Sequence, residues 1–173
     1  VYNKARKSFP ETEAVAIDAG YRTPWIAKQI IDNNQIPAMP YKRPMTPEGY
    51  FQKYKYVYDE YYDCYLCPND QVLKYSTTNR EGYREYVSDP RVCKSCPHRG
   101  MCTRSRDFKK TVTRHVWEDY LEKAEDYRHA PEIKAIYDKR KQTIERVFAD
   151  AKVKHGLRFT QLRGLAKVTM QVT

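Results

Sequence analysis

Apolar residues near the start of the chain predict a strand, a helix and a second strand. Residues 14–18 form a short, mostly apolar run that is typical of a buried strand. A helix is expected next, because Thr23 offers an N-cap hydroxyl, Pro24 suits a first helical position, and apolar residues then recur at helical spacing. The apolar run 36–39 predicts the second strand. This order indicates a parallel βαβ unit with Asp18 at the carboxyl end of its first strand.

The pattern changes near residue 40, where prolines, tyrosines and cysteines replace the helical spacing. The tyrosines crowd a short interval, partly in alternation, which favours strands: Tyr50, Tyr54, Tyr56, Tyr58, Tyr61, Tyr62 and Tyr65. All five cysteines follow between residues 64 and 102, among turn-forming residues. We interpret residues 40–112 as a separate, β-rich, cysteine-bearing insertion.

Helical periodicity resumes after Thr113, with Val116, Trp117, Tyr120, Leu121 and Ala124 on one face. Pro131 predicts the first turn of a further, long helix that ends at Gly156. The apolar residues of 168–172 fit either a strand or a frayed helix.

Composition indicates a globular protein. The chain has 173 residues, of which 40% are hydrophobic and 31% charged, so it is one large domain or two small ones, and fibrous or wholly disordered classes are excluded. No run approaches the roughly 20 apolar residues of a membrane span, and the first residues lack the apolar core of a signal peptide. We therefore expect a cytoplasmic protein. The chain begins at Val1 rather than Met, as an excerpt from a longer protein would.

The net charge of +10 is unevenly distributed and suggests a polyanionic partner. Residues 139–173 carry nine basic and two acidic side chains, whereas residues 114–138 carry four basic and seven acidic ones. A solvated, solubilising surface is the alternative explanation.

The cysteine spacing is Cys64-x2-Cys67 followed by Cys93-x2-Cys96-x5-Cys102. Two C-x2-C pairs separated by a loop are typical of a tetrahedral Zn²⁺ site. The preferred ligands are Cys67, Cys93, Cys96 and Cys102, with Cys64 as a replacement or a free thiol and His98 close enough to compete. Such zinc is structural and contributes on the order of 10 kcal/mol to the folding of small modules. Reduced cysteines packed as small apolar residues are the alternative.

Two acids, Asp18 and Glu145, form a second candidate site. Glu145 shares one face of the long helix with Phe148 and Lys152, which predicts an acid on a mostly apolar, inward-facing side. A buried carboxylate needs a partner. A salt bridge within the helix and coordination of Mg²⁺ or Mn²⁺ both satisfy this requirement.

Basic residues bracket Glu145 and continue toward the carboxyl end, as a surface for a phosphate backbone would require. They follow Tyr137 in the order Arg140, Lys141, Lys152, Arg158, Arg163 and Lys167. A solvated helix face would have a similar composition.

In these segments the chain resembles bacterial insertion-sequence transposases of the DDE type, specifically their carboxyl-terminal part. The resemblance is carried by residues 14–21, by Cys67-Pro68 with the later cysteines, and by residues 140–148. It implies an α/β ribonuclease H-like core, here its second half, interrupted by the β-rich insertion. Residues 1–39 are then the core βαβ segment, and residues 113–173 the helical segment with the catalytic Glu and the basic tail. Asp18 matches the second acid of the Asp-Asp-Glu triad, and Glu145 the third.

Many relatives carry a Tyr-x2-Arg-x3-Glu-x6-Lys signature, in which Tyr and Arg hold DNA near the active site. Glu145 and Lys152 fit it, but Arg140 stands five residues before Glu145, and Lys141 occupies the place of Arg. Tyr137 is shifted in the same way. The first Asp of the triad belongs well upstream, and residues 1–13 contain no acid in that context.

The resemblance implies DNA transposition by phosphodiester cleavage and strand transfer. Two Mg²⁺ or Mn²⁺ ions, about 3.5–4 Å apart, would activate the nucleophile and stabilise the leaving oxygen. Asp18 would bridge the ions and Glu145 would bind one. The expected partners are double-stranded DNA, as element ends and target, and a second copy of the chain in the DNA complex. In the cell the protein would associate with the nucleoid.

Two alternatives remain from the residues alone. The first is a non-enzymatic zinc module whose tyrosines stack on bases and whose basic tail follows the backbone. The second is an inactive transposase remnant.

Overall fold

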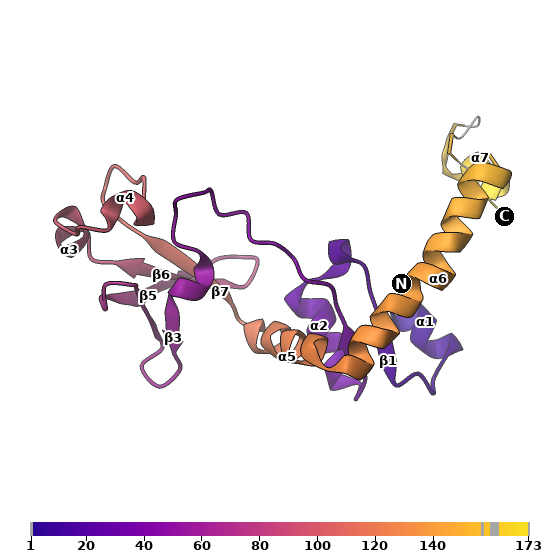
Figure 1. Ribbon diagram of the computed structural model, residues 1–173, viewed down its shortest axis with the longest axis horizontal. Helices are drawn as coiled ribbons and strands as arrows, with labels where there is room; N and C mark the ends of the chain where they lie inside the picture. The colour runs from indigo at the N-terminus through magenta and orange to yellow at the C-terminus, as the bar shows by residue number, and fades with distance from the viewer. Residues whose placement is uncertain (1, 157, 160–162, 173) are drawn as a thin grey trace. The chain divides into compact units, whose positions relative to one another are not determined.

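A computed structural model describes residues 2–156, 158–159 and 163–172. The chain divides into two compact units (Figure 1). Unit 1 comprises residues 1–22, 29–40 and 124–173, and unit 2 comprises residues 23–28 and 41–123. Both units contain helices and strands, so the fold is mixed α/β.

Unit 1 contains two short parallel strands and most of the helical residues. Its elements are α1 (Tyr2–Ser8), β1 (Ala14–Ala16), η1 (Ala19–Tyr21), the end of α2 (Pro24–Asp32), β2 (Ile36–Ala38), the end of α5 (Glu118–His129), α6 (Pro131–Lys154) and α7 (Leu165–Val172). Strand β1 pairs with β2 in parallel, with Ala14 opposite Ile36. The predicted βαβ unit is therefore confirmed.

Local sequence signals explain where helices α2 and α6 begin. The Thr23 hydroxyl accepts a hydrogen bond from Ile26 N at 3.3 Å, as expected of an N-cap. Pro131 occupies the first turn of α6, where its missing N–H costs nothing. Helix α6 contacts both β1 and β2, and Ile133, only 6% exposed, is the buried residue of its first turn.

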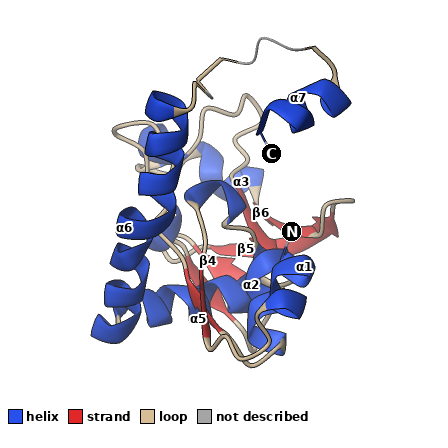
Figure 2. Cartoon of the chain, turned by 90° about the vertical axis from the view of Figure 1, so that its right-hand side faces the viewer, coloured by secondary structure: helices blue, strands red, loops and turns tan. Residues whose placement is uncertain are grey.

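Unit 2 is built on a five-stranded antiparallel sheet in which each strand pairs with the next along the chain. The strands are β3 (Val57–Asp59), β4 (Cys64–Leu66), β5 (Val72–Thr78), β6 (Tyr83–Ser88) and β7 (Thr111–His115), with η2 (Lys53–Lys55) before them. Figure 2 shows strands β4, β5 and β6 in red. Two short helices, α3 (Pro90–Lys94) and α4 (Arg99–Cys102), lie between β6 and β7. One face of the sheet carries an aromatic core of Tyr56, Tyr65, Leu73, Tyr86 and Val112.

The predicted start of the helix after Thr113 is wrong. The helical pattern expected directly after Thr113 begins only at Glu118, because residues 111–115 pair with β6 as a strand, with Arg114 opposite Arg84. The alternating, β-branched residues of that segment and their pairing partner override its helical spacing. The segment 168–172, left open between strand and helix, belongs to helix α7.

None of the described helices is long and apolar enough to cross a membrane.

Candidate functional site

Asp18 stands at the exit of β1, as its sequence position predicts. Its Oδ1 accepts a hydrogen bond from Ala19 N at 2.7 Å and caps the short helix η1. This bond fixes the carboxylate beside the strand end, while 61% of the side chain stays exposed. The acid is therefore held in place and open to solvent.

Arg140 connects Asp18 with Glu145. Its Nη2 lies 3.5 Å from Asp18 Oδ1 and 3.8 Å from Glu145 Oε1. The Arg140 side chain is only 14% exposed, and its Nη1 donates a hydrogen bond to the Tyr137 hydroxyl at 3.0 Å. Two acids that are far apart in the sequence thus share one guanidinium, because α6 runs against β1.

The environment of Glu145 differs from the sequence prediction. Glu145 is 52% exposed, and the neighbouring Val147 and Phe148 are 67% and 61% exposed, so this half of α6 is not an inward-facing side. The residues from Glu145 to Ala149 are all exposed. An exposed acid needs no buried partner, and an exposed ion pair adds only about 0–1 kcal/mol to stability. The ion pairs of Arg140 with Asp18 and Glu145 therefore contribute little to the stability of the fold.

A hollow of about 430 Å³ on α6 adjoins Glu145. Its lining includes Glu145, Phe148, Lys152 and Arg158. Both basic side chains are exposed, as are Arg163 and Lys167 farther along. The side chain of Lys141 lies outside the part of the chain that the structure describes. The geometry thus combines one acid with exposed cations, which suits a phosphate near a bound divalent ion.

The cysteines separate into two groups. Cys67 and Cys102 pack against the aromatic core of unit 2, and the Tyr56 hydroxyl lies 3.2 Å from Cys102 Sγ. Burial raises the pKa of Tyr56, and the hydrogen bond with Cys102 raises it further. Cys64 instead lines a hollow with Leu66 and Val72, and burial raises the pKa of its thiol. All five cysteines are free of disulfides.

No group of three or more His, Cys, Asp or Glu side chains within the described residues meets the distances of a metal site. The ring of His98, the competing ligand of the sequence analysis, packs edge-on against Phe51 with centroids 6.1 Å apart.

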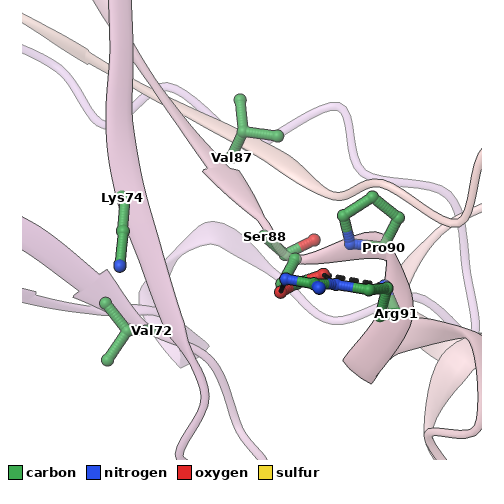
Figure 3. A pocket seen from close by; sticks show the side chains of 7 residues that line it. Val72, Lys74, Val87, Ser88, Pro90 and Arg91 are labelled. Carbon is green, nitrogen blue, oxygen red and sulfur yellow. Dashed lines mark hydrogen bonds and ion pairs between the residues drawn. The ribbon is translucent and has the colours of Figure 1, made fainter.

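A second hollow, of about 540 Å³, lies beside β5 and the start of α3 (Figure 3). It combines Val72 and Val87 with Lys74 and Arg91. Arg91 is paired with Asp89, its Nη2 lying 3.0 Å from Asp89 Oδ2, and this acid also caps α3. The charge of Arg91 is therefore balanced by Asp89, and Lys74 is a further cation in the lining.

Sequence reasoning missed two polar networks in the aromatic core. Asp63 accepts hydrogen bonds from the Tyr58 hydroxyl at 2.8 Å and from the Tyr86 hydroxyl at 2.7 Å, and it pairs with Arg84. Burial opposes ionisation of Asp63, but these donors outweigh it and lower the carboxyl pKa. Tyrosines spaced for strands indicate packing but do not reveal which hydroxyls share an acid.

Arg114 is the second missed residue. Its side chain is 9% exposed, pairs with Asp119 and Glu122, and lies 4.3 Å from the Tyr58 ring centroid. The bonds to Glu122 raise the pKa of Arg114, and the same bonds lower that of Glu122. Arg114 thereby fastens the start of α5 to the sheet.

The transposase DDE domain model matches residues 66–173 of this chain, more than half of its 173 residues. The chain therefore belongs to the DDE transposase family and corresponds to a carboxyl-terminal part of such a protein. Membership implies an action on DNA of the transposase type. Searches of curated proteins and of solved structures found no match.

Proposed function

We propose that this chain supplies the second and third acids of a DDE transposase active site, Asp18 and Glu145. The enzyme would cleave DNA phosphodiesters and transfer strands during transposition. The observation that carries the proposal is the position of both carboxylates within 4 Å of the Arg140 guanidinium. One cation already lies between the two acids, which is where a divalent ion is required.

The donor set fits Mg²⁺ or Mn²⁺. Both carboxylates offer hard oxygen ligands, both are exposed, and Mg²⁺ is commonly held by one or two carboxylates together with substrate phosphates. When bound, such ions activate the attacking hydroxyl and stabilise the leaving oxygen.

The protein's own side chains would position the DNA. Arg140 and Tyr137 lie beside the acids, and Lys152 and Arg158 line the hollow next to Glu145. Together with Lys141, Arg163 and Lys167 they would contact phosphates, which orients a duplex without reading its sequence. The partners would be the element ends, the target DNA and a second copy of the chain, in the cytoplasm at the nucleoid.

For the architecture we propose the second half of a ribonuclease H-like core interrupted by an insertion. Residues 1–39 would supply the βαβ segment, residues 40–112 the cysteine-bearing insertion, and residues 113–173 the helices with Glu145. The parallel β1–β2 pair, the contact of α6 with both strands and the separate antiparallel sheet support this division. A structural zinc ion would act on the folding of unit 2 rather than on phosphodiesters.

The test is the Glu145→Gln substitution in the longest open reading frame that contains this chain. The substrate is a labelled duplex carrying the inverted repeats that flank the coding region, with Mg²⁺ added. We expect cleavage to be abolished and DNA binding in a gel-shift assay to be retained, because Gln keeps the shape but not the charge of a metal ligand.

Glu132→Gln is the matched control, since Glu132 is an exposed acid in the first turn of the same helix. It should cleave like the parent protein. Retained cleavage by Glu145→Gln, or cleavage by the parent in excess EDTA, would remove Glu145 from the active site. Binding without any metal-dependent cleavage by the parent would instead support a binding module or an inactive remnant.

A further inference from the structure

Cys67 lies in a tight turn whose backbone points toward its sulfur. The N–H groups of Asn69 and Gln71 each donate to Cys67 Sγ at 3.4 Å. The turn is closed by Asp70 N donating to Cys67 O at 2.9 Å and by Cys67 N donating to Gln71 O at 3.0 Å. N–H groups directed at a metal-binding sulfur are outer hydrogen bonds of the kind that orient such ligands.

Cys102 lies against the aromatic core, where a polar group reaches its sulfur. The Tyr56 hydroxyl lies 3.2 Å from its sulfur, and Lys110 Nζ lies 5.1 Å from the centroid of the Tyr56 ring. Tyr56 is only 5% exposed, so the hydroxyl is held in place by packing. A buried donor and a nearby cation offset the negative charge that thiolate ligands leave on a metal site.

Cys93 lies in α3, and Cys96 lies in the turn that follows this helix. Asp89 caps α3, which carries Cys93, and Cys96 N then donates to Cys93 O at 3.3 Å in a turn after the helix. Two half-buried sulfurs thus leave one tight turn, as in the C-x2-C half of a zinc site.

Cys64 does not belong to this group. Residues alternate between the faces of a strand, so Cys64 and Leu66 point away from the face on which Tyr65 packs with Tyr56. Both of them line the hollow beside Val72. The geometry thereby separates the fifth thiol from the other four.

From these contacts we propose that unit 2 binds one structural Zn²⁺ through Cys67, Cys93, Cys96 and Cys102, with Tyr56 donating a hydrogen bond to the Cys102 sulfur. No three of these thiols already stand at ligand distances within the described residues, so binding requires side-chain rotation that turns the sulfurs toward one ion. Four thiolates close the coordination shell and leave no position for a substrate. The ion would fasten α3, α4 and the turn after β4 to one point.

The experiment measures metal content, which is independent of DNA cleavage. The whole chain is purified under reducing conditions, its zinc is quantified, and Co²⁺ is substituted to record the visible bands of tetrahedral thiolate coordination. We expect one zinc per chain for the parent and for Cys64→Ser, and loss of both zinc and the Co²⁺ bands for Cys93→Ser and Cys96→Ser. A parent without stoichiometric zinc, stoichiometric zinc in Cys93→Ser, or zinc loss in Cys64→Ser would overturn the proposal.

Tyr56→Phe provides a readout that does not depend on removing a ligand. It should keep one zinc and the Co²⁺ bands but bind zinc about 10- to 100-fold more weakly in competition with a chelator. Tyr62→Phe is the matched control, because Tyr62 is 73% exposed and lines the hollow that contains Cys64. Equal affinity of Tyr56→Phe and the parent would remove Tyr56 from the site, whatever the outcome of the cleavage assay.

Discussion

Replacing Arg114 by Met should destabilise unit 2 by about 2–4 kcal/mol. Met keeps an unbranched apolar stem in the 9% exposed position but removes the guanidinium. The lost contacts are hydrogen bonds from Nη1 to Glu122 Oε1 at 2.5 Å, from Nη2 to Glu122 Oε2 at 3.0 Å and from Nη2 to Asp119. The stacking of the guanidinium on Tyr58, at 4.3 Å, is lost as well.

The magnitude follows from how much water can replace these contacts. Hydrogen bonds to charged groups contribute about 1.5–3 kcal/mol each, and a cation over a ring about 0.5–2 kcal/mol. Asp119 and Glu122 are 65% and 58% exposed, so they recover hydration once Arg114 is gone. The three hydrogen bonds therefore stabilise the protein by much less than the sum of their individual energies. The expected loss accordingly lies toward the lower end of the range of about 2–4 kcal/mol.

The assay is urea unfolding followed by the near-ultraviolet circular dichroism of the tyrosines in unit 2, with free energies from linear extrapolation. Arg91→Met is the control, because Arg91 also pairs with a carboxylate but its side chain is 90% exposed. The control should leave the free energy of unfolding nearly unchanged, as expected of an exposed surface ion pair. Equal free energies of unfolding for the two variants would refute the reasoning.

Two further predictions concern the same unit. Stability should fall as the pH drops below about 4, because the folded state holds the pKa of Asp63 and Glu122 below the values of the unfolded chain. This contribution to stability is present above the pKa values of the unfolded chain and is lost as the pH falls through the pKa values of the folded state. Acid titration monitored by circular dichroism measures the loss. Asp63→Asn should make the stability less dependent on pH in this range. Gly82→Ala should destabilise the β6–β7 end of the sheet by roughly 1–2 kcal/mol, since Gly82 has φ +83° and an added Cβ would lie 3.1 Å from His115 Nε2. Thermal melting compares it with Gly49→Ala, whose φ of +80° is similar but whose surroundings are open, and equal losses would show that only the backbone angle matters.

Sequence reasoning succeeded where the signal is local. Thr23, Pro24 and Pro131 mark helix starts by their own chemistry, and the apolar runs around Asp18 are sufficient to predict the parallel pair. Each of these features depends on residues within one turn or one strand. The family resemblance, which the domain match confirms, also follows from short contiguous segments.

The remaining features depend on contacts between distant residues. The apolar spacing around Glu145 predicted burial, but exposure depends on whether another element lies against that face of α6. The pairing of β6 with β7 turned a helix-like segment into a strand. The position of Tyr56 beside Cys102 and of Arg114 beside Glu122 depends on sheet register, which no local pattern specifies.

The strand order of unit 2 also affects how unit 1 folds. Because β3 to β7 pair in chain order, this sheet forms from successive neighbouring contacts, which are the fastest to establish. Residues 41–123 separate β2 from the part of unit 1 that begins at residue 124, and their folding replaces a long flexible loop by a compact body. Each halving of effective loop length lowers the entropic cost of closure by about 0.6 kcal/mol. Early folding of the sheet would thus help Asp18 and Glu145 to meet, although neither residue belongs to it.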